Sequence, residues 1–143
     1  MTMKVVYIAG PYRGRTPWDV ETNIRKAEAI GLEVARMGFM PLIPHTMTRF
    51  FDKQCTSHFW IEGTLELLAR CDAMIVLPGW ENSDGTKGEI ALAEKRNIPY
   101  FWSMKDLGLW RQKLEHAEKI ALETTQPTSR DKTPPPIPRI DSE

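Results

Sequence analysis

The chain has 143 residues, of which 41% are hydrophobic and 27% charged, as in one ordinary globular domain. Its 19 basic and 19 acidic residues cancel, so no basic field would hold a polyanion, and nucleic-acid binding is disfavoured as the main role. The two cysteines, Cys55 and Cys71, lack the spacing of zinc ligands, so we expect free thiols and no metal site.

The first predicted element is a buried strand over residues 5–9, an apolar run that Gly10 and Pro11 end. This run is too short for a signal peptide or a membrane span. We therefore expect a cytoplasmic protein without a membrane partner, whose cysteines stay reduced.

A helix is predicted next. Thr16 offers a capping hydroxyl, Pro17 suits a first helical turn, and apolar residues then recur at helical spacing until Gly38. Residues 39–43 predict a strand at an edge of the sheet, because Pro41 lacks the amide hydrogen that a central strand needs.

The middle of the chain predicts a second helix and a central strand. Residues 45–56 are expected to be irregular, and Ser57 is predicted to cap a helix that runs to about Arg70. Residues 73–77 are uniformly apolar, which is typical of a central strand. Beyond it the patterns predict a loop over residues 78–85, a helix over 86–96, a strand over 98–102 and a helix over 106–122.

The composition changes at Thr124, where large apolar residues become scarce and prolines frequent. We expect residues 1–123 to form one domain and residues 124–143 to be a flexible Pro-rich tail. A polyproline ligand for a partner is an alternative role for this tail.

Strands that alternate with helices predict an α/β fold: a flavodoxin-like or Rossmann-like three-layer sandwich around a parallel sheet of four or five strands. Ligands of such sheets bind beyond the carboxyl ends of the strands. The site is therefore expected where the loops over residues 10–16, 44–57 and 78–88 meet the segment after Trp102.

The loop over residues 10–16 places Arg13 between a strand and a helix start, an arrangement that suits a phosphate group. It is neither a Walker loop nor a dinucleotide-binding loop, because the required glycines and lysine are absent. A plain turn with surface arginines is the alternative.

The loop over residues 78–88 is the stronger indication. Gly85 and Gly88 let a ligand approach the backbone, and Ser83 and Thr86 supply hydroxyls. Glu89 is expected in the first turn of the following helix, where the helix N-terminus would help to keep it ionised. An ionised carboxylate beside a sugar phosphate can attack or stabilise an anomeric carbon. The alternative is a glutamate that merely stabilises the helix.

Several motifs, in this order, resemble those of the nucleoside 2-deoxyribosyltransferase-like superfamily: Tyr7-Ile8-Ala9-Gly10, Arg13-Gly14, Cys71-Asp72-Ala73, Leu77-Pro78-Gly79-Trp80-Glu81 and Ser83-x-Gly85-x-x-x-Glu89. The resemblance covers roughly residues 4–103 and is closest to an uncharacterised branch, DUF4406, related to the deoxynucleoside 5′-monophosphate N-glycosidases. A second resemblance, to the glycine-rich loop of the lysine-decarboxylase-like phosphoribohydrolases, implies the same bond type.

The resemblance implies hydrolysis of the base–sugar bond of a nucleoside 5′-monophosphate, without a metal or organic cofactor, in a protein that we expect to be a homodimer. It implies that Glu89 is the nucleophile and that Tyr7 orients it. It further implies that Arg13 and Ser83 bind phosphate and that His45 lies in the base pocket. The other expected substrate contacts are Gly10, Tyr12, Gly14, Trp80, Gly85 and Thr86.

One position departs from the superfamily. Related enzymes carry an aspartate eight residues before Asp72, and here that position is Thr64. Asp72 itself is expected to be structural, and Glu62 is the predicted substitute that protonates or holds the leaving base. Three alternatives stay open: base exchange by a deoxyribosyltransferase, non-catalytic binding or sequestration of a nucleotide, and a redox flavodoxin-like domain, which the hydroxyl-poor first loop disfavours.

Overall fold

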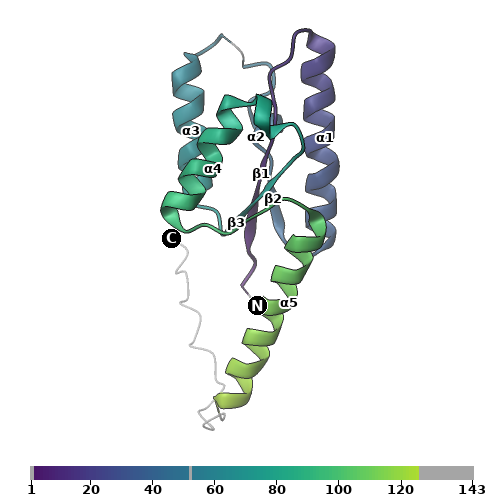
Figure 1. Ribbon diagram of the computed structural model, residues 1–143, viewed down its shortest axis with the longest axis vertical. Helices are drawn as coiled ribbons and strands as arrows, with labels where there is room; N and C mark the ends of the chain where they lie inside the picture. Colours follow the sequence, from purple (N-terminus) through teal and green to yellow (C-terminus); the bar gives the residue numbers. More distant parts are fainter. Residues whose placement is uncertain (1, 52, 126–143) are drawn as a thin grey trace, which may run out of the picture.

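The computed structural model describes residues 2–51 and 53–125. Within these residues, four strands form one parallel sheet in the order β2-β1-β3-β4: β1 (Val5–Ala9), β2 (Met40–Leu42), β3 (Ala73–Val76) and β4 (Tyr100–Phe101). Figure 1 shows the helices around this sheet, namely α1 (Pro17–Arg36), α2 (Pro44–Met47), α3 (Ser57–Ala69), the 3-10 turn η1 (Trp80–Asn82), α4 (Asp84–Arg96) and α5 (Met104–Thr124). The predicted three-layer α/β class is confirmed.

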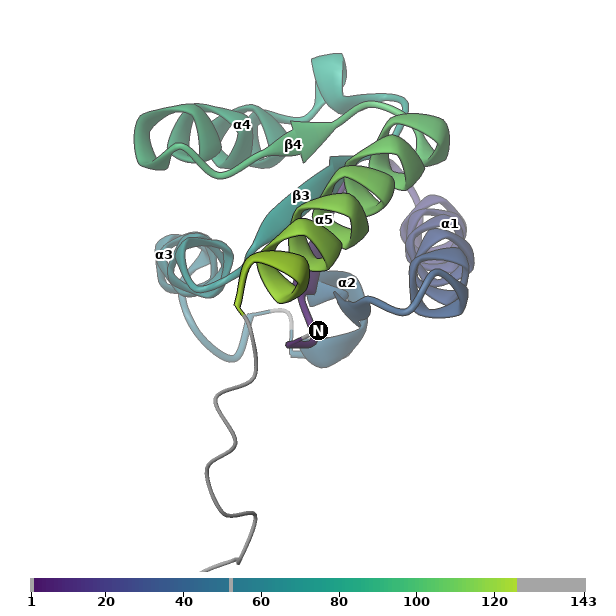
Figure 2. The ribbon, with the colours of Figure 1, turned by 90° about the horizontal axis from the view of Figure 1, so that it is seen from below.

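The alternation of side chains along β1 divides the core in two. Val6 and Ile8 point to one face and pack with residues of α1 and α5. Tyr7 and Ala9 point to the other face and pack with residues of α3 and α4. Figure 2 shows the resulting layers, with α1 and α5 on one side of the strands and α3 and α4 on the other. Tyr7 is thereby directed toward the α3–α4 layer.

The first helix has the predicted ends. The Thr16 hydroxyl accepts from the Asp19 amide at 3.2 Å, and the Asp19 carboxylate accepts from the Thr16 amide at 3.1 Å, which closes a capping box. The helix stops just before Gly38, whose φ of +94° favours glycine.

Several element boundaries differ from the prediction. The α3 cap is Thr56, not Ser57, because the Thr56 hydroxyl accepts from the Phe59 amide at 3.2 Å. Helix α4 begins two residues early, since Ser83 is its cap and accepts from the Thr86 amide. The segment predicted to be irregular contains α2, whose first residue, Pro44, has a fixed φ that suits a helix start.

The edges of the sheet are shorter than predicted, with three residues in β2 and two in β4. The predicted edge position of β2 and interior position of β3 are both confirmed. Helix α5 begins at Met104, earlier than predicted, because Ser103 caps it. Of the predicted tail, residues 126–143 lie outside the described residues.

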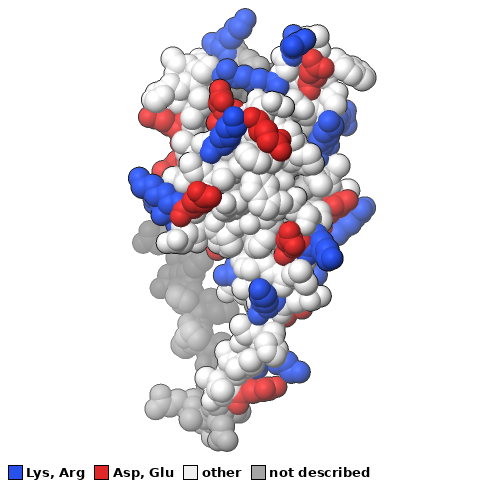
Figure 3. Space-filling model, in the orientation of Figure 1, with Lys and Arg blue, Asp and Glu red and all other residues white. Residues whose placement is uncertain are grey.

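Charged side chains of both signs are mixed over the molecular face in Figure 3, so no broad basic field covers that face. None of the described helices is long and apolar enough to cross a membrane.

Candidate functional site

A cavity of about 660 Å³ lies at the carboxyl ends of the central strands. Its lining combines residues from the loop after β1, the α2–α3 region and the start of α4, as predicted for a parallel sheet. Nine of the residues predicted from the sequence line it together: Tyr7, Gly10, Tyr12, Arg13, His45, Ser83, Gly85, Thr86 and Glu89. This volume accommodates a small organic ligand of nucleotide size.

Two side chains hold the loop that carries Arg13. The His45 Nε2–H group faces the carbonyl oxygens of Gly10 and Pro11 at 3.1 and 3.0 Å. The Asn23 amide group donates to the carbonyl oxygens of Tyr12 and Arg13 at 3.2 and 3.3 Å. Four consecutive carbonyl groups are thus held by two side chains, and this leaves the loop preorganised beside the cavity.

His45 therefore has a structural role that the sequence did not indicate. It is 6% exposed, and burial lowers the pKa of its imidazole, opposed by the contacts with the two carbonyl groups. A neutral ring that donates from Nε2 accounts for both carbonyl contacts. Its ring also packs edge-on against Tyr12, with centroids 5.9 Å apart.

Ser83 keeps a hydrogen-bond donor available. Its oxygen accepts from the Thr86 amide at 3.2 Å and from the Thr86 hydroxyl at 2.9 Å. With both acceptor positions used, the Ser83 hydroxyl hydrogen is left to donate to a group in the cavity. At Gly85, which also lines the cavity, a side chain would extend into open space, so its absence leaves room for a ligand.

The central feature of the cavity is the pair formed by Tyr7 and Glu89. The buried Tyr7 hydroxyl, projecting from β1, faces the Glu89 carboxylate on α4, and their contact lowers the pKa of Glu89. Burial and the facing carboxylate raise the pKa of Tyr7 well above its usual range, so this hydroxyl stays a donor. This contact is the one through which Tyr7 would orient Glu89, a role that stays a prediction.

The protonation of Glu89 differs from the prediction. Because α4 begins at Asp84, Glu89 lies in the second helical turn, beyond the strongest effect of the helix N-terminus. Burial of the carboxyl group raises the pKa of Glu89 to about 7, and the bond from Tyr7 partly opposes this rise. Burial thus favours the protonated form of this carboxyl group, contrary to the prediction that the helix N-terminus keeps it ionised.

The leaving-group side of the site carries no second carboxylate at the place predicted for it. Thr64 lines the cavity next to Tyr7, but a hydroxyl is a poor acid. Glu62 is exposed and pairs with His58 at 2.9 Å, and it does not line the cavity. Asp72 accepts from the Val5 amide at 2.8 Å, in keeping with its predicted structural role.

Two other predicted contacts also lie outside the cavity lining. A Cβ at Gly14 would lie 2.3 Å from the Asp19 Cβ, so this glycine serves the close approach of the loop to the α1 cap. Trp80 packs against Trp102, with ring centroids 5.0 Å apart, at the edge of the core. Both residues shape the loops around the site.

The sequence predicted the loop over residues 44–57 at the site, but not the individual residues that form one wall of the cavity: Thr48, Phe51, Lys53, Trp60 and Ile61. Asn23, on the inner side of α1 beside buried Ile24 and Ala27, was not predicted either. A polar amide at an inward-facing position of a helix is the sequence signal that could have found it. Among the described residues, no three His, Cys, Asp or Glu side chains lie close enough to hold a metal ion.

The fold and the cavity define a flavodoxin-like α/β protein with a cavity at the ends of its central strands. Residues 4–103 match the model of a family described as Domain of unknown function (DUF7768), and the chain belongs to this family. The match does not support the DUF4406 branch that the motifs implied. No curated protein matches the chain.

Several solved structures are similar to this chain, and two of them illustrate the degree of similarity. A conserved protein from Enterococcus faecalis V583 has 19% identity and a TM-score of 0.57, over 84% of this chain and 77% of that one. A 2-deoxyribosyltransferase from Bacillus psychrosaccharolyticus has 16% identity and a TM-score of 0.49, over 67% of this chain and 69% of that one. The first of these similarities supports the fold class alone.

Proposed function

We propose that the protein hydrolyses the N-glycosidic bond of a nucleoside or deoxynucleoside 5′-monophosphate. The observation that carries this proposal is the Tyr7–Glu89 pair, which shares one cavity with Arg13 and the donor hydroxyl of Ser83. A carboxylate and an anion-binding group in the same cavity suit a sugar phosphate, and the motif resemblance implies the same chemistry.

In the first step the Glu89 carboxylate attacks C1′, the bond from C1′ to the base nitrogen breaks, and its electron pair leaves with the base. Tyr7 orients the carboxylate through its hydroxyl group. In the second step water attacks C1′ of the glycosyl ester, and the bond from C1′ to the Glu89 oxygen breaks, so its electron pair returns to the carboxylate. One hydrogen of the water is released as a proton, and the sugar phosphate leaves. The departing base takes up one proton.

The position predicted for the general acid carries none, since Thr64 is a hydroxyl and Glu62 faces solvent. Water in the open cavity supplies the proton in our proposal. Bases that leave readily as anions are then the better substrates, because protonation contributes least to their release. The same observation favours the second candidate function, binding or sequestration of a nucleotide without turnover.

The direct test incubates the purified protein with ribonucleoside and deoxyribonucleoside 5′-monophosphates and detects free base. We expect release of base and sugar phosphate from at least one of them. Addition of a second base separates hydrolysis from base exchange, since exchange yields a new nucleotide. Nucleotide binding without any base release would support the sequestration function and reject the enzyme.

Tyr7→Phe should shift the pH dependence of the reaction. The hydrogen bond from Tyr7 lowers the pKa of Glu89, so its loss raises that pKa and moves the acidic limb of kcat/KM to higher pH. Activity at pH 7 falls and recovers partly in more alkaline buffer. Tyr100→Phe is the matched control, because Tyr100 donates to exposed Glu94 at 2.7 Å outside the cavity lining. An unmoved limb in Tyr7→Phe would contradict the orienting role.

A further inference from the structure

The aromatic wall of the cavity belongs largely to one irregular stretch between α2 and α3, here called the wall segment (residues 48–51 and 53–56). Thr48, Phe51 and Lys53 of this segment line the cavity. Phe51 meets Trp60 of α3 at a centroid distance of 5.8 Å. The aromatic rings of Phe51 and Trp60 suit a planar base, whereas the polar groups of Arg13 and Ser83, which also line the cavity, suit a phosphate.

The backbone of the wall segment has an unusual conformation. Phe50 and Lys53 have φ values of +68° and +65°, in the left-handed region that residues other than glycine rarely adopt. Each such residue costs about 1 kcal/mol or more and persists only where neighbouring contacts hold it. Local bonds from the Phe51 amide to the Thr48 carbonyl and from the Gln54 amide to the Phe51 carbonyl, both 3.0 Å, contribute to this.

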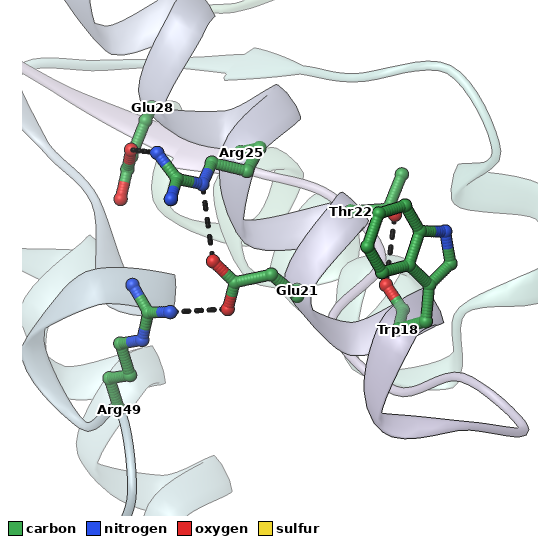
Figure 4. A network of polar contacts seen from close by, with 6 residues as sticks. All are labelled: Trp18, Glu21, Thr22, Arg25, Glu28 and Arg49. Atoms are coloured by element: carbon green, nitrogen blue, oxygen red, sulfur yellow. Dashed lines mark hydrogen bonds and ion pairs between the residues drawn. The ribbon is translucent and has the colours of Figure 1, made fainter.

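An ion pair ties the segment to α1. Arg49 donates to one carboxylate oxygen of Glu21, and Arg25 donates to the other at 3.1 Å, as Figure 4 shows. The Arg49 guanidinium also lies 5.0 Å from the centre of the Phe50 ring. The side chains of Arg49 and Glu21 are 31% and 32% exposed, whereas that of Arg25 is 69% exposed. The pair between Arg49 and Glu21 is thus partly shielded from water, which strengthens it.

We infer that the Glu21–Arg49 pair is a positioning device that holds Phe51 and Lys53 in the cavity wall and so sets the affinity for the base half of the ligand. Neither Glu21 nor Arg49 lines the cavity, and the pair acts through the segment that does. The role of the wall in base recognition rests on the proposed function. The effect of the pair on the wall does not.

The first measurement follows hydrogen exchange in the free protein and needs no ligand. In Arg49→Gln, exchange of the amides of the wall segment should accelerate while that of the central strands stays unchanged. Arg25→Gln is the matched control, because it removes the other partner of the Glu21 carboxylate and keeps the contact between Glu21 and Arg49. Exchange of the wall amides should stay unchanged in this control. Unchanged exchange of the wall amides in Arg49→Gln would overturn the inference, whether or not the protein binds nucleotides.

The second measurement compares two kinds of ligand by calorimetry: the common nucleoside and deoxynucleoside 5′-monophosphates, and deoxyribose 5-phosphate, which lacks a base. Arg49→Gln should weaken nucleotide binding about tenfold and leave binding of the sugar phosphate unchanged. With turnover, KM rises while kcat is retained. The exchanged pair Glu21→Arg with Arg49→Glu should restore nucleotide affinity.

Equal weakening of both ligands, or unchanged nucleotide affinity despite a loosened wall, would reject the role in base recognition. Failure of the wild-type protein to bind any nucleotide would instead reject the proposed function, and the exchange measurement would still decide what the ion pair does.

Discussion

Glu89→Gln is expected to lower base release by at least about a thousandfold, because the amide cannot form the glycosyl ester. The measurement is the rate of free-base formation at pH 8, where the wild-type carboxylate is mostly ionised, given its pKa of about 7. Glu94→Gln on the same helix is the control, since Glu94 is exposed and pairs only with Tyr100 among the described contacts. Activity of Glu89→Gln within tenfold of wild type would reject the covalent mechanism.

The same substitution should stabilise the fold, which separates loss of chemistry from loss of structure. The folded-state pKa of Glu89, about 7, lies above its ordinary value of 4.5, so the folded state holds the proton more tightly. The stability that this proton confers is complete below pH 4.5 and is lost as the pH rises to about 7 and beyond. Because each pKa unit is worth about 1.4 kcal/mol, removing the carboxyl group raises the free energy of unfolding by up to about 3 kcal/mol at neutral pH. Denaturant unfolding at pH 5 and pH 8 checks this difference.

Arg13→Gln should lower kcat/KM for a nucleoside monophosphate by about 10- to 100-fold, the worth of a charge-assisted hydrogen bond to phosphate. The corresponding nucleoside, which lacks the phosphate, should bind the variant and the wild type equally. Arg15→Gln is the control, because Arg15 follows in the same loop but does not line the cavity. If both ligands lose affinity equally in Arg13→Gln, the phosphate lies elsewhere.

The arrangement of the sheet was predictable from the sequence because its strands are short apolar runs between clear turn residues. Pro41 marked the edge position of β2, and the uniform apolarity of β3 marked its interior position. The exact helix starts were less predictable, since adjacent hydroxyl residues such as Thr56 and Ser57 are equivalent as caps until the backbone is known. Helix α2 was missed because four residues are too few to show a helical period.

The cavity was predictable to the extent that it depends on strand ends. Arg13, Ser83 and Glu89 lie in loops or helix starts that the parallel topology must bring together. The residues of the aromatic wall were not individually predictable, because the contact between Arg49 and Glu21 joins positions 28 residues apart and leaves no local sequence signal. The protonation of Glu89 was mispredicted because a place in the first helical turn suggested an ionised group, whereas burial dominates.

Tyr7 is at once a core residue and a group of the site, since it is 1% exposed and packs with Leu68, Met74 and Ala93. A displacement of any of these neighbours moves the phenol that holds Glu89, even where the domain stays folded. Core packing and the geometry of the site are therefore coupled: a substitution in the α3–α4 layer acts on the position of Tyr7 as well as on folding, whereas the residues of α1 and α5 pack on the other face of the sheet.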